Sequence, residues 1–225
     1  EVGIARTRAA FRDIGELREV EALFVEQIAR ARHFIYAESQ YFASRSIAEA
    51  IAERVSETDP PEIVLVNPLT AEGWLEQTAM DAARVRLLHA IAEADHANRF
   101  RVFVPKTSGG AAIYVHAKLL IVDDEIVPVA SPNMNNRSMG LDTEADVFID
   151  AARPGNGHAA EAITRLRLAL IAEHCGIGIE KLQQLLADHR TMAAAIDAAP
   201  KQGKRLEAFG LRPLTDTEKA IADSA

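Results

Sequence analysis

In the first half of the chain, short strand-like runs alternate with longer helical patterns, and this rhythm constrains the fold more than any other feature. The strand-like runs are too short for helices and are apolar or rich in strand-forming residues. The runs are 34–36, 62–66 and 101–104, and the helical patterns cover about 15–32, 45–57 and 73–95. This order predicts an α/β fold in which a mixed sheet is sandwiched between helices.

The second half begins with a different pattern. Two β runs, Ile113 to Val122 and Ile126 to Ala130, are joined by Asp123-Asp-Glu125, which predicts a hairpin. A further strand is expected from Ala145 to Ile149, and the chain after Gly155 is helical and rich in alanine. The sheet is therefore expected to gain antiparallel strands here.

Length and composition indicate one large domain. The 225 residues are 48% apolar, enough for a substantial core, and we expect the domain to cover 1–200 and a polar, loosely packed tail to cover 201–225. The formal net charge of -8 argues against a nucleic-acid partner. The single cysteine, Cys175, excludes an internal disulfide and is expected to be structural.

The ends of the chain bear on localisation. The chain starts with Glu1 in place of methionine and reads as a fragment, so targeting signals would be missing. A cytoplasmic or peripheral membrane location is the expectation, because no stretch of about 18 apolar residues is present.

Polar side chains suited to phosphate chemistry gather around the predicted hairpin. His116 and Lys118 are two apart, so on a strand they share a face. Imidazole can attack phosphorus or donate a proton near neutral pH, and an ammonium stabilises phosphate oxygens. Ser131 and Asn133 follow as neutral hydrogen-bonding groups, whereas Asp123 lies at the turn, away from this spot. On spacing alone, such a motif is more often surface decoration than a catalytic site.

Several segments together resemble the phospholipase D superfamily. The stretch Val115 to Asp124 resembles the second His-x-Lys-x4-Asp signature of that family, and four other segments resemble its further motifs. These segments are Ile35 to Phe42, Ser131 to Gly140, Leu141 to Glu144 and Leu166 to Gly176. The chain differs from the family pattern at Ser39, Ala130 and Pro132.

The resemblance implies a phosphodiesterase or phosphatidyltransferase that forms a phosphohistidine on one histidine and protonates the leaving alcohol with another. It implies no metal and no other cofactor. By this resemblance, His116 is the general acid and later the general base, and Glu144 orients it. Lys118, Ser131 and Asn133 bind the phosphate. Asp123 belongs to the catalytic signature but is mainly structural.

Only one His-x-Lys pair occurs in the sequence, so a second histidine must come from elsewhere. We expect the C-terminal half of a two-motif enzyme of the bacterial phospholipase D-like or cardiolipin synthase-like kind. Its partners would be the missing N-terminal half and a phospholipid or other phosphodiester, with peripheral membrane contact. The alternatives are a single-motif homodimeric nuclease and an inactive interaction domain. A half-site also predicts a bared, partly apolar sheet surface near His116.

Overall fold

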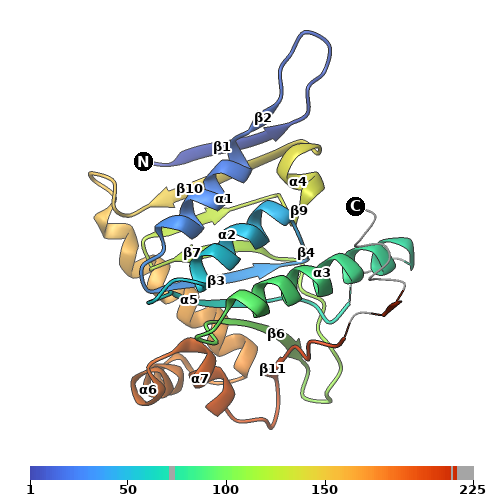
Figure 1. Cartoon of the computed structure of the whole chain (residues 1–225). Coiled ribbons are helices and arrows are strands. Elements are labelled where there is room, and N and C mark those ends of the chain that lie inside the picture. Colours follow the sequence, from blue (N-terminus) through green and yellow to red (C-terminus); the bar gives the residue numbers. More distant parts are fainter. Residues whose placement is uncertain (71–73, 214, 217–225) are drawn as a thin grey trace.

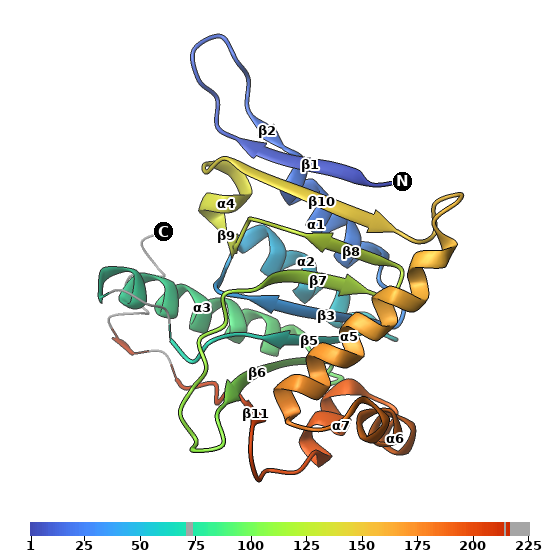
Figure 2. The same ribbon diagram turned by 180° about the vertical axis from the view of Figure 1, so that it is seen from behind.

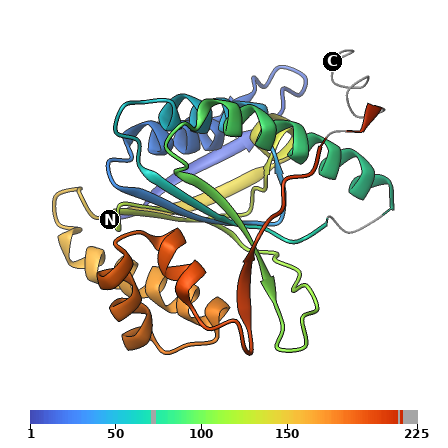
Figure 3. The same cartoon turned by 60° about the horizontal axis from the view of Figure 1, so that its bottom comes forward.

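The computed structural model, which describes residues 1–70, 74–213 and 215–216, has a large mixed sheet with helices on both faces (Figure 1, Figure 3). The predicted α/β sandwich is confirmed. The sheet strands are β1 (Gly3–Arg8), β2 (Leu17–Arg18), β3 (Phe34–Ser39), β5 (Glu62–Val66), β6 (Phe100–Lys106), β7 (Lys118–Val122), β8 (Ile126–Val129), β10 (Glu144–Asp150) and β11 (Arg205–Ala208). The helices are α1 (Glu19–Arg30), α2 (Arg45–Val55), α3 (Trp74–Ala94), α4 (Asn136–Gly140), α5 (Ala160–Cys175), α6 (Ile179–His189) and α7 (Met192–Ala198), with a 3-10 turn at Gly157–Ala159.

The sheet changes character at β3. Its strand order is β11-β6-β5-β3-β7-β8-β10-β1-β2. β3 is parallel to β5 and antiparallel to β7, and the strands beyond β7 continue antiparallel. The last residue pair between β3 and β7 joins Ser39 to Lys118. The end of β3 therefore meets the beginning of β7, which places the predicted catalytic segment at one end of these two central strands.

Two hydrophobic cores flank the sheet because side chains alternate along its strands. On one face, Ala37 and Leu120 pack with α1, α2 and α3. On the other face, Tyr36 and Ile121 pack with α5, α6 and α7. Figure 2 shows that α5 to α7 cover the β3, β5 and β6 side of this second face and leave much of β1, β10 and β8 bare. No helix in the described ranges is long and apolar enough to cross a membrane.

The predicted hairpin is present, and two aspartates form its turn. Asp123 and Asp124 have positive φ angles of 52° and 55°, the pattern of a two-residue type I′ turn. The Asp123 carboxylate accepts backbone N–H groups of Arg32, His33 and Phe34 at 2.7, 2.9 and 2.8 Å. The Asp124 carboxylate accepts two hydrogen bonds of 2.7 Å from Arg167 on α5. The turn therefore links the sheet by hydrogen bonds to the segment that follows α1 and to α5.

Two expectations were wrong. The strand predicted from Ile113 begins only at Lys118, because β3 ends at Ser39 and leaves residues 113–117 without that neighbour. The tail expected to pack loosely contains β11, which pairs with β6 and buries Leu206. A domain boundary at residue 200 therefore does not match the sheet. Residues 214 and 217–225 of that tail lie outside the described residues.

Candidate active site

The imidazole of His116 and the ammonium of Lys118 are in contact at the beginning of β7. Lys118 Nζ lies 3.2 Å from Nδ1 and 3.4 Å from Nε2 of the ring, and it donates to the His116 carbonyl at 2.8 Å. Sequence spacing predicted this pairing, although His116 precedes the strand. His116 is exposed, whereas Lys118 is half-buried. Burial lowers the pKa of Lys118, and the nearby negative charge of Glu144 opposes that shift.

Gln40 completes the surroundings of Lys118, and sequence reasoning gave it no role. Lys118 Nζ donates to Gln40 Oε1 at 3.1 Å. Gln40 follows Ser39 at the end of β3, 78 residues from Lys118 along the chain. The resemblance of Ile35 to Phe42 to a family motif pointed to this segment but not to the contact.

Ser131 and Glu144 form a second pair beside the first. Ser131 Oγ donates a short hydrogen bond to Glu144 Oε2 and accepts one from the Ala145 N–H at 3.2 Å. The Ser131 N–H donates to Asp146 Oδ1, also at 3.2 Å. Among the described residues, no hydrogen bond joins Glu144 to His116. Orientation of His116 by Glu144 therefore stays a prediction, and Ser131 is the partner seen.

The asparagines of the loop have separate tasks. Asn135 Oδ1 accepts the Ser138 N–H at 2.8 Å and caps α4. Asn133 Oδ1 is buried and has no hydrogen-bond partner among the described residues. Rotating this amide would exchange the acceptor for a donor. Phosphate binding by Asn133 stays a prediction.

Ser39 fixes the loop to the sheet. Its Oγ accepts the Met134 N–H at 3.3 Å and donates to the Tyr41 carbonyl at 2.7 Å. Next to it, β4 (Phe42–Ala43) pairs in parallel with β9 (Met134–Asn135). The serine that departs from the family pattern thus has a structural role. Asp123, at the far end of β7, does not join this group of side chains.

A buried cluster lies on the other side of β3. Glu38 Oε1 accepts the Tyr36 hydroxyl at 2.6 Å and lies 3.2 Å from His174 Nε2 on α5. Burial and the Glu38 charge hold the pKa of Tyr36 well above its usual value. His174 is buried, and burial raises the pKa of the Cys175 thiol to about 11. These groups face the helical layer, away from His116.

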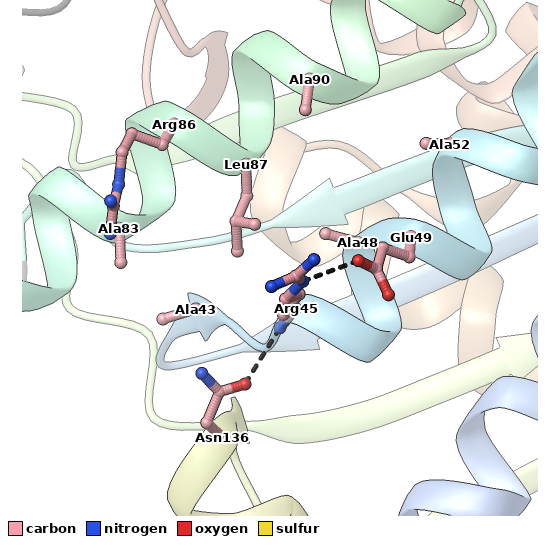
Figure 4. A pocket seen from close by; sticks show the side chains of 10 residues that line it. All are labelled: Ala43, Arg45, Ala48, Glu49, Ala52, Ala83, Arg86, Leu87, Ala90 and Asn136. Atoms are coloured by element: carbon pink, nitrogen blue, oxygen red, sulfur yellow. Dashed lines mark hydrogen bonds and ion pairs between the residues drawn. The ribbon is translucent and has the colours of Figure 1, made fainter. Parts of the chain in front are cut away.

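A cavity of about 490 Å³ opens between α2 and α3 (Figure 4). Half of its lining residues are alanines, and Arg45, Glu49, Arg86 and Asn136 are its polar positions. His116 and Lys118 do not line this cavity. Within the described ranges, no group of three or more His, Cys, Asp or Glu residues is placed to hold a metal ion.

The sequence is similar to a family of known proteins and to individual members of it. The family model described as Phospholipase D matches residues 46–217. Phospholipase D delta of Arabidopsis thaliana is 26% identical over 219 residues, an alignment that covers 71% of this chain and 25% of that protein. A phospholipase D of Phytophthora infestans is also 26% identical, with 72% of this chain and 12% of that protein covered. The chain thus spans a quarter or less of these two relatives.

One solved structure supports the fold alone. The phosphatidylserine synthase of Haemophilus influenzae Rd KW20 aligns with a TM-score of 0.55 and 14% identity. The alignment covers 88% of this chain and 47% of that one.

Proposed function

Because the chain belongs to the phospholipase D family, we propose that it supplies half of a phosphodiester-cleaving active site centred on His116. The observation that carries the proposal is the contact between the exposed His116 ring and Lys118 Nζ at 3.2 Å, where β7 begins. An imidazole beside an ammonium provides a proton-transferring group and a phosphate-binding cation in one place.

The reaction that fits is a double displacement. A histidine from a second unit attacks phosphorus, and the bond from phosphorus to the leaving alcohol oxygen breaks. His116 gives its proton to that oxygen. It then takes a proton from water or an acceptor alcohol, which attacks the phosphohistidine and releases the product. Lys118, Ser131 and Asn133 would hold the non-bridging oxygens, while Glu144 would position Ser131 and its negative charge would act on Lys118.

The described part of the chain does not place a second histidine beside His116. Of the seven histidines, only His116 has a lysine two residues later. Within the described part of the chain, the ring contacts of His116 are with Lys118. His174 lies beyond β3, next to Glu38, on the opposite side of the sheet. A second unit carrying another His-x-Lys pair would complete the site.

An exposed apolar stripe supports such a partner. Ile4, Val147 and Val129 are directly paired across β1, β10 and β8, so they form a row on one face. They are 65%, 46% and 68% exposed, and much of the strands that carry them is left bare by α5 to α7 (Figure 2). Val129 is in turn paired with Leu119, which follows Lys118. Because side chains alternate along a strand, the stripe lies on the α5 to α7 face of the sheet, and it reaches β7 at Leu119, on the face opposite to that of Lys118.

We propose a phospholipid as the substrate and a peripheral location at a membrane surface, since the family comparisons name phospholipases. The test is phosphodiesterase and phosphatidyl-transfer activity on phospholipid vesicles, on single-stranded DNA and on a soluble phosphodiester reporter. This chain and the protein encoded by its complete gene would be compared. The variants are His116→Ala and, as a matched control, His96→Ala, whose exposed side chain lies in a loop away from the site.

Lipid cleavage by the complete gene product alone, lost in His116→Ala and kept in His96→Ala, is the expected result. DNA cleavage by this chain as a dimer would replace the proposal with the single-motif nuclease. Lack of activity in both proteins on all three substrates would indicate an inactive interaction domain.

A further inference from the structure

The side chain of Gln40 uses both ends of its amide at the proposed site. Oε1 accepts from Lys118 Nζ at 3.1 Å, and Nε2 donates to the Tyr114 hydroxyl at 2.9 Å and lies 3.3 Å from the Tyr41 hydroxyl. This orientation places the acceptor against the ammonium, whereas the reverse would place two donors together. The amide is therefore held in one orientation by its neighbours.

The ammonium of Lys118 has three protons, and its three neighbours differ in kind. One is the backbone carbonyl of His116, at 2.8 Å, and another is the His116 ring. The third, Gln40 Oε1, is the only one of them that comes from a distant part of the chain, just after β3. Because Lys118 has a flexible four-carbon stem, the Gln40 amide that follows β3 is what fixes Nζ relative to the sheet.

The neutral charge of Gln40 matters as much as its position. A carboxylate in the same place would pair with the ammonium and compete with a phosphate for its charge. Glu144, the carboxylate whose charge acts on Lys118, already accepts from Ser131 Oγ. Gln40 therefore holds the ammonium without neutralising it.

Tyr114 extends this link to the segment that carries His116. The Tyr114 hydroxyl binds Gln40, and only Val115 separates Tyr114 from His116. Residues 113–117 have no partner on β3, so this hydrogen bond helps to hold the segment against the sheet.

We propose that Gln40 is a positioning residue that fixes the Lys118 ammonium beside His116 as a free positive charge for a phosphate oxyanion. The proposal rests on the phosphate-binding role proposed for Lys118. It adds the requirement that residue 40 be a neutral hydrogen-bond acceptor.

The test uses two substitutions of similar size and a matched control elsewhere in the chain. Gln40→Glu adds a negative charge, and Gln40→Met removes the acceptor. The chain offers a second pair of the same kind, since Lys181 Nζ donates to Gln184 Oε1 at 3.2 Å on the exposed face of α6. Gln184→Glu therefore makes the same chemical change far from the site. Tyr114→Phe tests the link to the His116 segment without changing residue 40.

Two readouts are needed, and neither depends on turnover. The first is the pKa of each lysine, measured by NMR on protein with labelled lysine side chains. The chain has only six lysines, and the signal missing from the Lys118→Arg spectrum is that of Lys118. The second is binding of inorganic phosphate by calorimetry. We expect Gln40→Glu to raise the pKa of Lys118 and to weaken phosphate binding roughly tenfold. Gln40→Met should weaken binding by a smaller factor, and Tyr114→Phe by a smaller one still.

The control should raise the pKa of Lys181 and leave phosphate binding and Lys118 unchanged. The proposal is overturned if Lys118 titrates alike in the folded wild-type, Gln40→Glu and Gln40→Met proteins. Failure of the proposed function has a different signature. Phosphate binding would then be the same in Lys118→Ala as in the wild type, while the lysine titrations would still decide whether Gln40 positions Lys118.

Discussion

The backbone N–H of Ser131 lies 3.2 Å from Oδ1 of Asp146, a fully buried carboxyl group whose other oxygen has no partner among the described residues. Burial raises the pKa of Asp146 from 3.8 to about 7, the hydrogen bond from Ser131 opposes the rise, and Glu144 adds to it. The candidate site is thus built over an acid that titrates near neutral pH.

This acid predicts a pH-dependent stability. Between pH 3.8 and about 7, the folded chain keeps a proton that the unfolded chain releases. The contribution of Asp146 to the free energy of unfolding is therefore full below this pH range and is lost as the pH rises through it. Asp146→Asn, which does not titrate, should gain roughly 2–4 kcal/mol relative to wild type between pH 4.5 and pH 8. Urea midpoints at both pH values measure this, and a constant difference would rule it out.

The turn aspartate is expected to contribute stability. Asp123→Ala removes the side-chain acceptor that three backbone N–H groups share, one of them part-buried. We expect the free energy of unfolding to fall by about 3 kcal/mol. Phosphate binding by the folded protein should not change, because Asp123 lies at the far end of β7 from Lys118. Urea unfolding and calorimetry on one preparation test both statements, and weakened binding in the folded variant would give Asp123 a direct role.

The lone thiol should be inert in the folded chain. Cys175 is buried, and its pKa is raised to about 11 by burial, so little thiolate forms at pH 8. A disulfide reagent should label it at least about 100-fold more slowly in buffer than in 6 M guanidinium chloride. Rapid labelling of the native protein would mean that α5 opens readily.

The apolar stripe should drive association. Val129→Lys and Val147→Lys each place a charge in the row of paired side chains, and both should weaken self-association or binding to a complementing unit. The control is Ile179→Lys, which changes an exposed apolar residue at the start of α6. Sedimentation velocity over a range of concentrations would separate them. Equal behaviour of all three variants would remove the stripe as an interface.

Local sequence was sufficient where a segment decided its own structure. The all-apolar core of 62–66 predicted β5 at its observed bounds, and paired aspartates predicted the hairpin turn. Prediction failed where the structure of a segment depends on pairing with a segment that is distant along the chain. Helix α1 begins at Glu19 rather than near residue 15 because Leu17–Arg18 pairs with β1. β11 was missed because its four residues include a single fully buried side chain, Leu206.

The candidate site divides in the same way. His116 and Lys118 are two residues apart, so their contact followed from spacing. The contacts of Gln40 with Lys118 and of Asp146 with Ser131 join different strands and loops, and no local pattern announces them. The bond between Ser131 and Glu144, in place of one to His116, likewise depends on the path of the loop between β8 and β10.

The pairing of β1 with β10 implies that the strands of the sheet do not form at the same time during folding. β7, β8 and β10 follow one another closely along the chain, so their ladders close short loops. The contact between Ile4 and Val147 must instead close a loop of about 140 residues, whose entropy cost is paid late. We expect β1 to dock last and to exchange its amide protons first, so that the outermost part of the stripe is the least permanent part of the fold.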